Sequence, residues 1–168
     1  MRDTAFKNVL GSMPLGSTVK IEGPSGNLTL HNNVTRTAVF VAGGIGITPF
    51  RSILFRAAKE KLPHRIILFY SNRRPEDAPF LEELQSLEQE NPNYKLVACM
   101  TGMAKSHRPW QGEVGLIDKD MLLRFVKDAG SPIYYLAGPP EMVKGLHTAI
   151  NEAGVDDDDI RAEDFFGY

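Results

Sequence analysis

A glycine-rich turn lies in the segment from Val39 to Phe50, where an apolar stretch runs into a helical pattern. Its small and helix-starting residues are Gly43, Gly44, Gly46, Thr48 and Pro49. The glycines lack the Cβ atoms that would keep a diphosphate off the backbone, the threonine suits a helix N-cap, and the proline suits the first helical position. Because a helix start favours an anion by roughly 0.3–1 kcal/mol, this segment could cradle a phosphate.

The glycine spacing departs from two common phosphate-binding motifs. The stretch Gly44–Pro49 reads GxGxxP, whereas the usual dinucleotide fingerprint ends in Gly or Ala. The lysine of the P-loop is absent as well, which disfavours nucleoside triphosphate chemistry. A tight turn between strand and helix, with no ligand, therefore remains an alternative.

A second polar group follows the next apolar stretch, where the chain reads Tyr70-Ser71-Asn72-Arg73-Arg74. Dinucleotide-binding folds place an acid here for a ribose 2′-hydroxyl, or a basic group for a 2′-phosphate. Ser71, Arg73 and Arg74 offer a hydroxyl and two guanidinium groups, and no carboxylate comes before Glu76. The sequence therefore predicts a preference for NADPH over NADH. The alternative is that both arginines pair with the acids that follow them in a surface loop.

A third segment, Tyr135–Met142, repeats the order of apolar stretch, glycine and helix start. Gly138 ends the apolar stretch, and Pro139 and Pro140 suit the opening of a helix. Loops at the carboxyl ends of parallel strands flank the ligand crevice, so this loop could border a nicotinamide. Taken alone the signal is weak, because Gly-Pro turns are frequent between strands and helices.

The elements that must position these loops alternate from about Ala38 onward between apolar and amphipathic stretches. The predicted strands are Ala38–Ala42, Arg65–Tyr70, Tyr94–Met100, Pro132–Ala137 and Ile160–Phe165. The predicted helical stripes are Ile53–Ala57, Phe80–Leu87, Met121–Phe125 and Met142–Ile150, with Asp118 as an N-cap. The expected fold is therefore α/β, a doubly wound five-stranded parallel sheet with helices on both faces.

The first 37 residues have a different pattern. Val19–Glu22 and Leu28–Leu30 are predicted as short strands around the turn Gly23–Gly26, typical of a β-barrel fragment. The polar stretch His31–Thr37 is expected to be a linker, which places a domain boundary between residues 37 and 38. Unpaired strand edges need a covering partner, so self-association through the barrel remnant is expected.

Composition narrows the function classes. With 19 basic and 21 acidic residues, the formal charge of −2 gives no general attraction to nucleic acid. No apolar run of about 18 residues suggests a membrane span, and the single cysteine, Cys99, cannot form an internal disulfide, so a cytoplasmic location is expected. The four histidines have no ligand spacing, and Asp156–Asp159 fits a solvated loop better than a calcium site, so we expect no metal.

The three segments together, in this order and at comparable spacing, resemble the ferredoxin–NADP reductase family. The resemblance implies that Thr48 contacts the diphosphate or ribose of NAD(P)H. It further implies that Ser71, Arg73 and Arg74 contact the adenosine side. The residues implied beside the nicotinamide are Gly138, Pro139, Pro140 and Met142.

The closing sequence Ala162–Tyr168 is similar to the Glu-x-aromatic end of the same family. This similarity implies that Glu163 and Phe165 lie near the junction of flavin and nicotinamide, with Phe165 as a stacking face. The segments Ala5–Leu10 and Val19–Gly26 resemble the last third of the family's flavin-binding barrel, which implies that Thr4 faces the flavin diphosphate. Most of that barrel is missing from the sequence.

These features predict the NAD(P)H-binding domain of a flavin-dependent oxidoreductase. The complete protein is expected to use FAD and to pass electrons to an acceptor protein or domain, while the cofactors carry the redox chemistry. The first alternative is a non-catalytic nucleotide-binding module without its own flavin. The second is a structural α/β interaction domain that binds no nucleotide.

Overall fold

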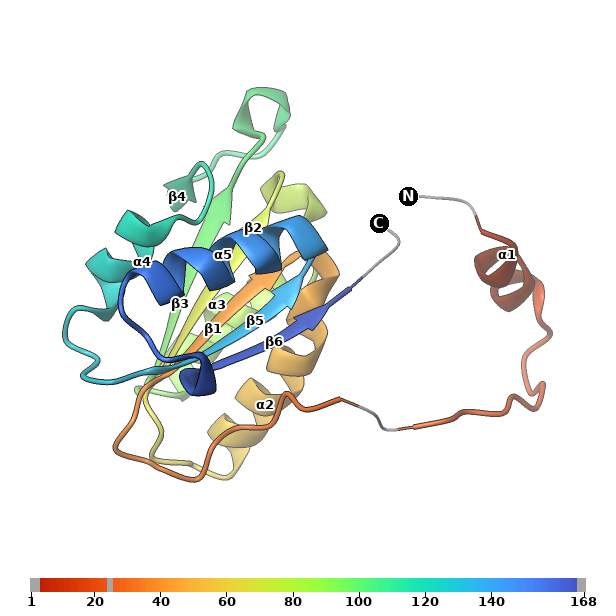
Figure 1. Cartoon of the computed structure of the whole chain (residues 1–168). Coiled ribbons are helices and arrows are strands. Elements are labelled where there is room, and N and C mark those ends of the chain that lie inside the picture. The colour runs from red at the N-terminus through yellow and green to blue at the C-terminus, as the bar shows by residue number, and fades with distance from the viewer. Residues whose placement is uncertain (1–3, 24–25, 166–168) are drawn as a thin grey trace.

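Six parallel strands form the centre of the computed structural model, which describes residues 4–23 and 26–165 (Figure 1). The strands are β1 (Ala38–Gly43), β2 (Ile66–Asn72), β3 (Tyr94–Met100), β4 (Glu113–Val114), β5 (Ile133–Gly138) and β6 (Ile160–Asp164). Their order in the sheet is β4-β3-β2-β1-β5-β6, and every neighbouring pair is parallel. The five predicted strands are confirmed at nearly the expected bounds.

The central strands β1 and β5 are buried along their whole length. Such strands are covered on both faces, so their sequences read as continuous apolar runs and are easily recognised. The sixth strand, β4, was not predicted. It has two residues, paired with Cys99 and Met100 of β3, and so short a strand shows no readable alternation.

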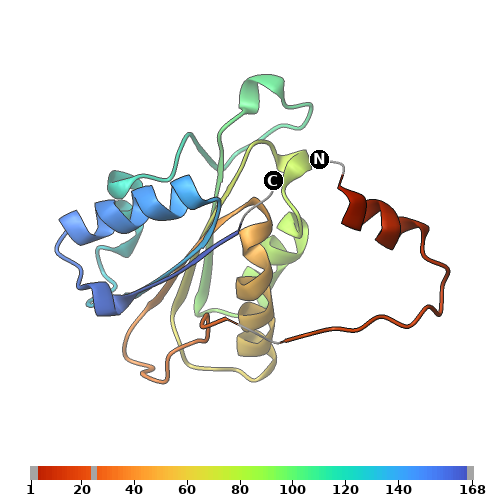
Figure 2. The same cartoon turned by 45° about the vertical axis from the view of Figure 1, so that its right-hand side comes forward.

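Two helices cover each face of the sheet (Figure 2). The helices α2 (Ile47–Lys59) and α3 (Leu81–Glu90) pack on one face, and α4 (Lys119–Val126) and α5 (Pro140–Glu152) on the other. Asp118 is confirmed as an N-cap, because its Oδ1 accepts a hydrogen bond of 2.8 Å from the amide of Met121. The predicted doubly wound fold is therefore confirmed, with six strands in place of five.

Strand order reverses between β1 and β5. The chain runs from β1 outward through β2, β3 and β4, then crosses over to β5 and β6 on the other side of β1. The carboxyl ends of β1 and β5 consequently lie side by side, with connections leaving toward opposite faces. In open α/β sheets this switch point is where ligands bind.

The predicted strands Val19–Glu22 and Leu28–Leu30 are wrong. The N-terminal region forms helix α1 (Ala5–Ser12), and the described residues that follow it up to Thr37 contain no strand. A strand needs a neighbour for its backbone hydrogen bonds, and no partner strand lies beside these segments within the described residues. Val19 and Ile21 are exposed to 52% and 85%, whereas Leu28 and Leu30 pack against the sheet instead. The described residues therefore form no barrel fragment.

The expected linker is fastened to the sheet domain. Arg36 forms two hydrogen bonds with the carboxylate of Asp159, at 2.8 and 2.6 Å, and its Nε donates to the carbonyl of Ser131 at 2.6 Å. The pKa of Asp159 is lowered chiefly by the hydrogen bond from Arg36. The domain boundary between residues 37 and 38 stays a prediction, but the chain before it is held in place.

Two buried histidines hold the same segment. The His31 ring lies 2.9 Å from the hydroxyl of Tyr135 and 3.0 Å from the carbonyl oxygen of Arg36. His64 lies with its Nε2 2.8 Å from the carbonyl oxygen of His31, and its buried Nδ1 has no partner among the described residues. The surroundings of His31 favour its neutral ring, because burial penalises the charged form and lowers its pKa.

We expect the free energy of unfolding to fall at acid pH because of His31. Burial is the main cause that lowers its pKa below the usual value, with a smaller contribution from the nearby His64 and Arg161. The unfolded chain therefore binds the proton first, so this stabilisation is complete above about pH 6.5 and is lost as the pH falls through the folded-state pKa. Urea unfolding at about pH 7.5 and about pH 5 would measure it.

The matched variants for this test are His31→Gln and His107→Gln. His107 is exposed, so its replacement should leave the pH dependence unchanged, while His31→Gln should make it shallower. The same pH dependence in His31→Gln and the unmodified chain would contradict the assignment.

Candidate nucleotide-binding site

The glycine turn after β1 packs directly against the loop after β5. A Cβ on Gly43 would lie 2.7 Å from Sδ of Met142, and a Cβ on Gly138 would lie 3.0 Å from the amide nitrogen of Gly43. A Cβ on Gly46 would overlap the carbonyl oxygen of Ala137. These glycines therefore make room for protein atoms, and the predicted contact of Gly43 and Gly46 with a diphosphate stays a prediction.

Gly44 is the exception in this turn. Its φ of +53° is in the left-handed region, and a Cβ built on it would meet no protein atom within 4 Å. Gly44 therefore both forms the turn and leaves its outer side open. Of the three glycines in this turn, it is the one that fits the predicted approach of a ligand.

The start of α2 differs from the prediction. A short 3₁₀ turn, Gly44–Gly46, leads into the helix, whose N-cap is Gly46 without a side-chain hydrogen bond. Thr48 is the second helical residue, and its Oγ1 donates to the carbonyl of Ile45 at 3.1 Å instead of capping the helix. Pro49 is the third helical residue and not the first. The amide-rich turn still lies at the carboxyl end of β1, where Thr48 is exposed.

The start of α5 agrees with the sequence. Pro139 is the N-cap residue, Pro140 is the first helical residue, and the carbonyl of Pro139 accepts hydrogen bonds from the amides of Met142 and Val143 at 3.0 and 3.1 Å. Met142 is half-buried and places its sulfur against Gly43. The openings of α2 and α5 thus flank the junction of β1 and β5 from the two faces of the sheet.

The end of β6 lies beside this junction. Glu163 is paired in register with Ala137, and its Oε1 accepts a hydrogen bond of 2.6 Å from the amide of Asn27. The amide of Phe165 donates to the carbonyl of Gly138 at 2.9 Å, and the half-buried ring packs against the core. The remaining residues of the predicted closing element, 166–168, lie outside the described residues.

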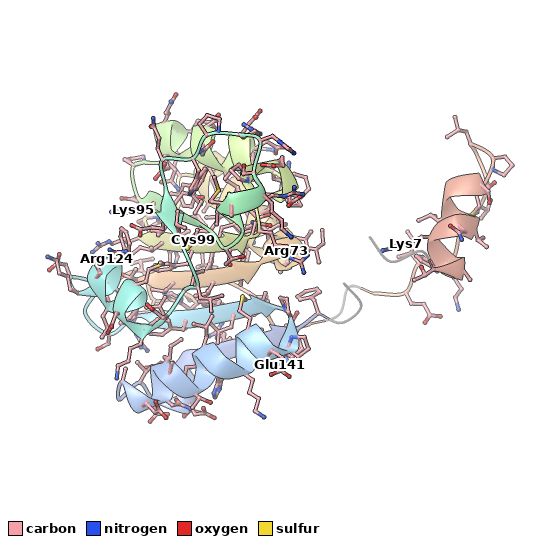
Figure 3. All side chains as sticks on the ribbon, turned by 90° about the horizontal axis from the view of Figure 1, so that it is seen from above. Lys7, Arg73, Lys95, Cys99, Arg124 and Glu141 are labelled. Atoms are coloured by element: carbon pink, nitrogen blue, oxygen red, sulfur yellow. The ribbon has the colours of Figure 1, made fainter. Side chains whose placement is uncertain are left out.

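The predicted adenosine-side residues separate into two groups. Ser71 is half-buried and paired with Gly43, and Arg73 is exposed (Figure 3). Arg74 instead donates twice to the carboxylate of Asp77, at 2.6 and 2.9 Å, and these bonds are the main cause that lowers the pKa of Asp77. For Arg74 the structure therefore has the ion pair that the sequence left open as an alternative.

The view from above separates the two sides of the sheet domain (Figure 3). Arg73 and Glu141 both lie at the carboxyl edge of the sheet, on the side toward α1, and Arg124 of α4 lies at the opposite side. Thr4 is the N-cap of α1, since its Oγ1 accepts a hydrogen bond from the amide of Lys7 at 3.3 Å. Helix α1 stands away from the sheet, so Thr4 is not brought together with the other predicted residues.

Asn72 was missed by the sequence interpretation. It is the last residue of β2, its side chain is buried, and its carbonyl accepts from the amide of Thr101 at 2.9 Å. This contact joins the loops after β2 and β3, and a second one, from the amide of Gly102 to the carbonyl of Arg73 at 2.7 Å, continues it. The one available signal was an amide side chain directly between Ser71 and Arg73 at a strand end.

Metal-binding side chains are scattered over the described chain. Within residues 4–23 and 26–165, no group of three or more His, Cys, Asp or Glu side chains could hold a metal ion. In the run Asp156–Asp159, the first residue caps a short 3₁₀ helix, and Asp159 binds Arg36. No helix in the described part of the chain is long and apolar enough to cross a membrane.

The sheet order, the glycine turn at the switch point and the two flanking helix starts define a dinucleotide-binding α/β domain. The family model for the oxidoreductase NAD-binding domain matches residues 40–148, and the chain belongs to this family. The resemblance to ferredoxin–NADP reductases is thereby confirmed, and the chain is a nucleotide-binding domain of this oxidoreductase type.

Curated relatives are subunits F of Na⁺-translocating NADH-quinone reductases. The one from Methylococcus capsulatus is 30% identical over 156 residues, which is 90% of this chain and 38% of the relative. The one from Idiomarina loihiensis is 28% identical over 160 residues, which is 93% of this chain and 39% of the relative. The chain thus spans about two fifths of the length of the curated relatives it matches.

Solved structures share the fold. A flavohemoglobin from Malassezia yamatoensis with bound FAD and heme has a TM-score of 0.80 at 24% identity, covering 95% of this chain and 40% of that one. A ferredoxin NADP⁺ reductase from Neisseria gonorrhoeae with bound FAD and NADP has a TM-score of 0.76 at 21% identity, covering 99% and 72%. These likenesses confirm the doubly wound architecture.

Proposed function

We propose that this chain binds NAD(P)H across the carboxyl ends of β1 and β5 and positions its nicotinamide for hydride transfer to or from FAD. The observation that carries the proposal is the contact between Gly43 and Gly138, which brings the two loops together at the switch point. The open side of Gly44, at the turn that leads into α2, fits a diphosphate there. Nicotinamide and flavin supply the hydride chemistry, and the chain aligns them.

The predicted residues outside the glycine turn have binding or positioning roles in this proposal, as Thr48 does at the start of α2. Thr48, exposed at the start of α2, contacts the diphosphate or ribose. Ser71 and Arg73 lie toward the adenosine side, and Arg74 reaches a 2′-phosphate only by leaving Asp77. The nicotinamide wall consists of Gly138, Pro139, Pro140 and Met142.

The end of β6 completes the nicotinamide site in this proposal. The amide of Phe165 donates a hydrogen bond to the carbonyl of Gly138, so its ring lies next to the nicotinamide wall and offers it a face. Glu163 is a positioning residue, because its carboxylate holds Asn27 and so fixes the N-terminal segment beside β6. Neither side chain acts as an acid or base, since hydride transfer between the cofactors needs none.

The remaining proposals concern the complete protein: its FAD, its electron acceptor and its cellular location. We assign Thr4 to the flavin diphosphate, because its helix start is free to face one. An acceptor protein or domain takes the electrons onward. The exposed Val19 and Ile21 need a cover, which is the flavin domain in the complete protein and a second copy when the chain is alone. We propose a cytoplasmic location, which the single cysteine suits.

The deciding experiment is a titration of the purified chain with NADPH and NADH, followed by an absorbance spectrum. Saturable nucleotide binding together with a visible flavin band, bleached by NADPH, supports the oxidoreductase. Nucleotide binding without a flavin band, and without NADPH oxidation after added FAD, supports the binding module. Absence of saturable binding to either nucleotide would leave only the structural interaction domain.

Replacing Thr48 by Asp should weaken the binding of both nucleotides, because a carboxylate would oppose the diphosphate at the start of α2. Thr148→Asp is the matched control, since Thr148 is exposed on α5 away from the helix start. We expect the dissociation constants to rise by about fivefold or more in Thr48→Asp alone. Unchanged titrations for this variant would remove Thr48 from the site.

A further inference from the structure

A cavity of about 230 Å³ opens between α4 and α5, and nothing in the proposed function uses it. One wall is a face of α4, where Lys119, Leu122, Leu123, Val126 and Lys127 follow one another at helical spacing. The opposite wall comes from the last turns of α5, including Ala149. Sites for drug-sized ligands measure roughly 300–1,000 Å³, so this cavity suits a smaller molecule.

The cavity is remote from the nucleotide site. Its floor includes Tyr134, near the amino end of β5, whereas the nucleotide loop begins at Gly138, on the order of 13 Å further along the strand. Helix α5 likewise begins at the nucleotide site and reaches the cavity with its last turns. In Figure 3, Arg124 marks α4 on the side opposite Arg73 and Glu141.

The polar groups of the cavity lack partners within the protein. Tyr134 is 4% exposed and lines the cavity, yet its hydroxyl forms no hydrogen bond with any residue in the described part of the chain. The hydroxyl oxygen is not one of the fully buried unpaired atoms, so it reaches the open cavity, where a ligand could bond it. Lys119 and Lys127 are exposed and form no ion pair with the described residues. The lining thus holds two ammonium groups and no carboxylate.

We propose that this cavity binds a small monocarboxylate with an aromatic or branched apolar body. The apolar body would lie against Leu122 and the half-exposed Leu123, which is 45% exposed without it. The hydroxyl of Tyr134 donates to the carboxylate, and a lysine at either end of the groove pairs with its charge. A small apolar anion matches both the walls and the charge of the rim, which a neutral or cationic ligand does not.

The test is an amide-resolved NMR titration of the full chain with phenylacetate and, as the uncharged match, phenylacetamide. Saturable shifts should be confined to the cavity lining, with a dissociation constant on the order of 1 mM and about fivefold tighter for the acid. Replacing both Lys119 and Lys127 by Gln should abolish the difference between acid and amide. Lys144→Gln, an exposed position on α5 outside the lining, should retain it.

Filling the cavity provides the second arm of the test. Ala149→Leu should remove the saturable shifts. Leu123→Gln should weaken binding, and because Leu123 is at an exposed position that tolerates a polar group, this variant keeps the test usable if Ala149→Leu fails to fold. Several outcomes would overturn the proposal: no saturable shift of the lining amides, equal affinity for acid and amide, or unchanged binding in both variants. Shifts that depend on protein concentration without ligand would show a second copy in the groove and overturn it as well.

Discussion

Gly46→Ala is expected to destabilise the fold by about 3 kcal/mol and to lower its melting temperature by roughly 6–12 °C. The added methyl group would overlap the backbone of Ala137 in β5, and backbone in a central strand cannot move aside as a flexible side chain can. The loops after β1 and β5 would have to separate. Nucleotide binding should fall with stability, because the same contact shapes the proposed site.

Gly44→Ala is the matched variant for this prediction. Its methyl group would project into open space, so the cost to stability is the strain of a positive φ, about 1 kcal/mol. Its effect on nucleotide affinity should exceed its effect on stability, since the methyl group would stand where the diphosphate approaches. Thermal unfolding and nucleotide titration of both variants separate the two roles. Wild-type stability in Gly46→Ala would show that the loops are not locked together.

Arg73→Ala is expected to reduce the affinity for NADPH by about tenfold and to leave the affinity for NADH nearly unchanged. Only NADPH carries a 2′-phosphate, and a charge-assisted hydrogen bond contributes about 1.5–3 kcal/mol, less where solvent screens it. Arg73 is exposed and forms no salt bridge with the described residues, and its charge makes only a minor contribution to the lowered pKa of the nearby Asp77, so its guanidinium can bind a phosphate. Titration with both nucleotides measures the preference.

The neighbouring Arg74 provides the control. Its guanidinium is held by Asp77, so Arg74→Ala should change NADPH affinity less than Arg73→Ala does. Asp77→Asn should loosen Arg74, which keeps its contacts with Glu76 at 3.7 Å and with the carbonyl of Lys105 at 3.3 Å, and should raise the affinity for NADPH, because it removes a competing carboxylate. Equal affinity for NADPH and NADH in the unmodified chain, or equal losses for both in Arg73→Ala, would contradict the predicted preference.

Local patterns in the sequence were sufficient for the four helices on the sheet and for every strand of the sheet except the two-residue β4. Strands such as β1 and β5 are buried on both faces and therefore appear as continuous apolar runs, and Asp118 is a capping residue in an expected place. Spacing also identified the loops of the candidate site, because a glycine or a proline at a strand end marks a change of direction. These features depend on neighbours along the chain.

Features that depend on distant neighbours could not be predicted in the same way. Gly43 and Gly46 face protein atoms because β5 lies next to β1. The sequence around the two glycines does not show which strand will be their neighbour. The 3₁₀ turn before α2 displaced Thr48 from the capping position for a similar reason, because Gly46 must approach β5 closely. The N-terminal stretches have apolar residues in alternation, but alternation produces a strand only where a partner strand exists.

The two outer strands of the sheet have a consequence for aggregation. An open strand edge is a template for another chain, and natural proteins guard it with short strands, charges or covering segments. The edge strand β4 has only two residues, while β6 carries Arg161 and Glu163, which hold residues 27–29 alongside it. The segment at residues 27–29 therefore covers the edge of β6 and limits edge-to-edge association. A shortened chain beginning at Ala38 would expose this edge.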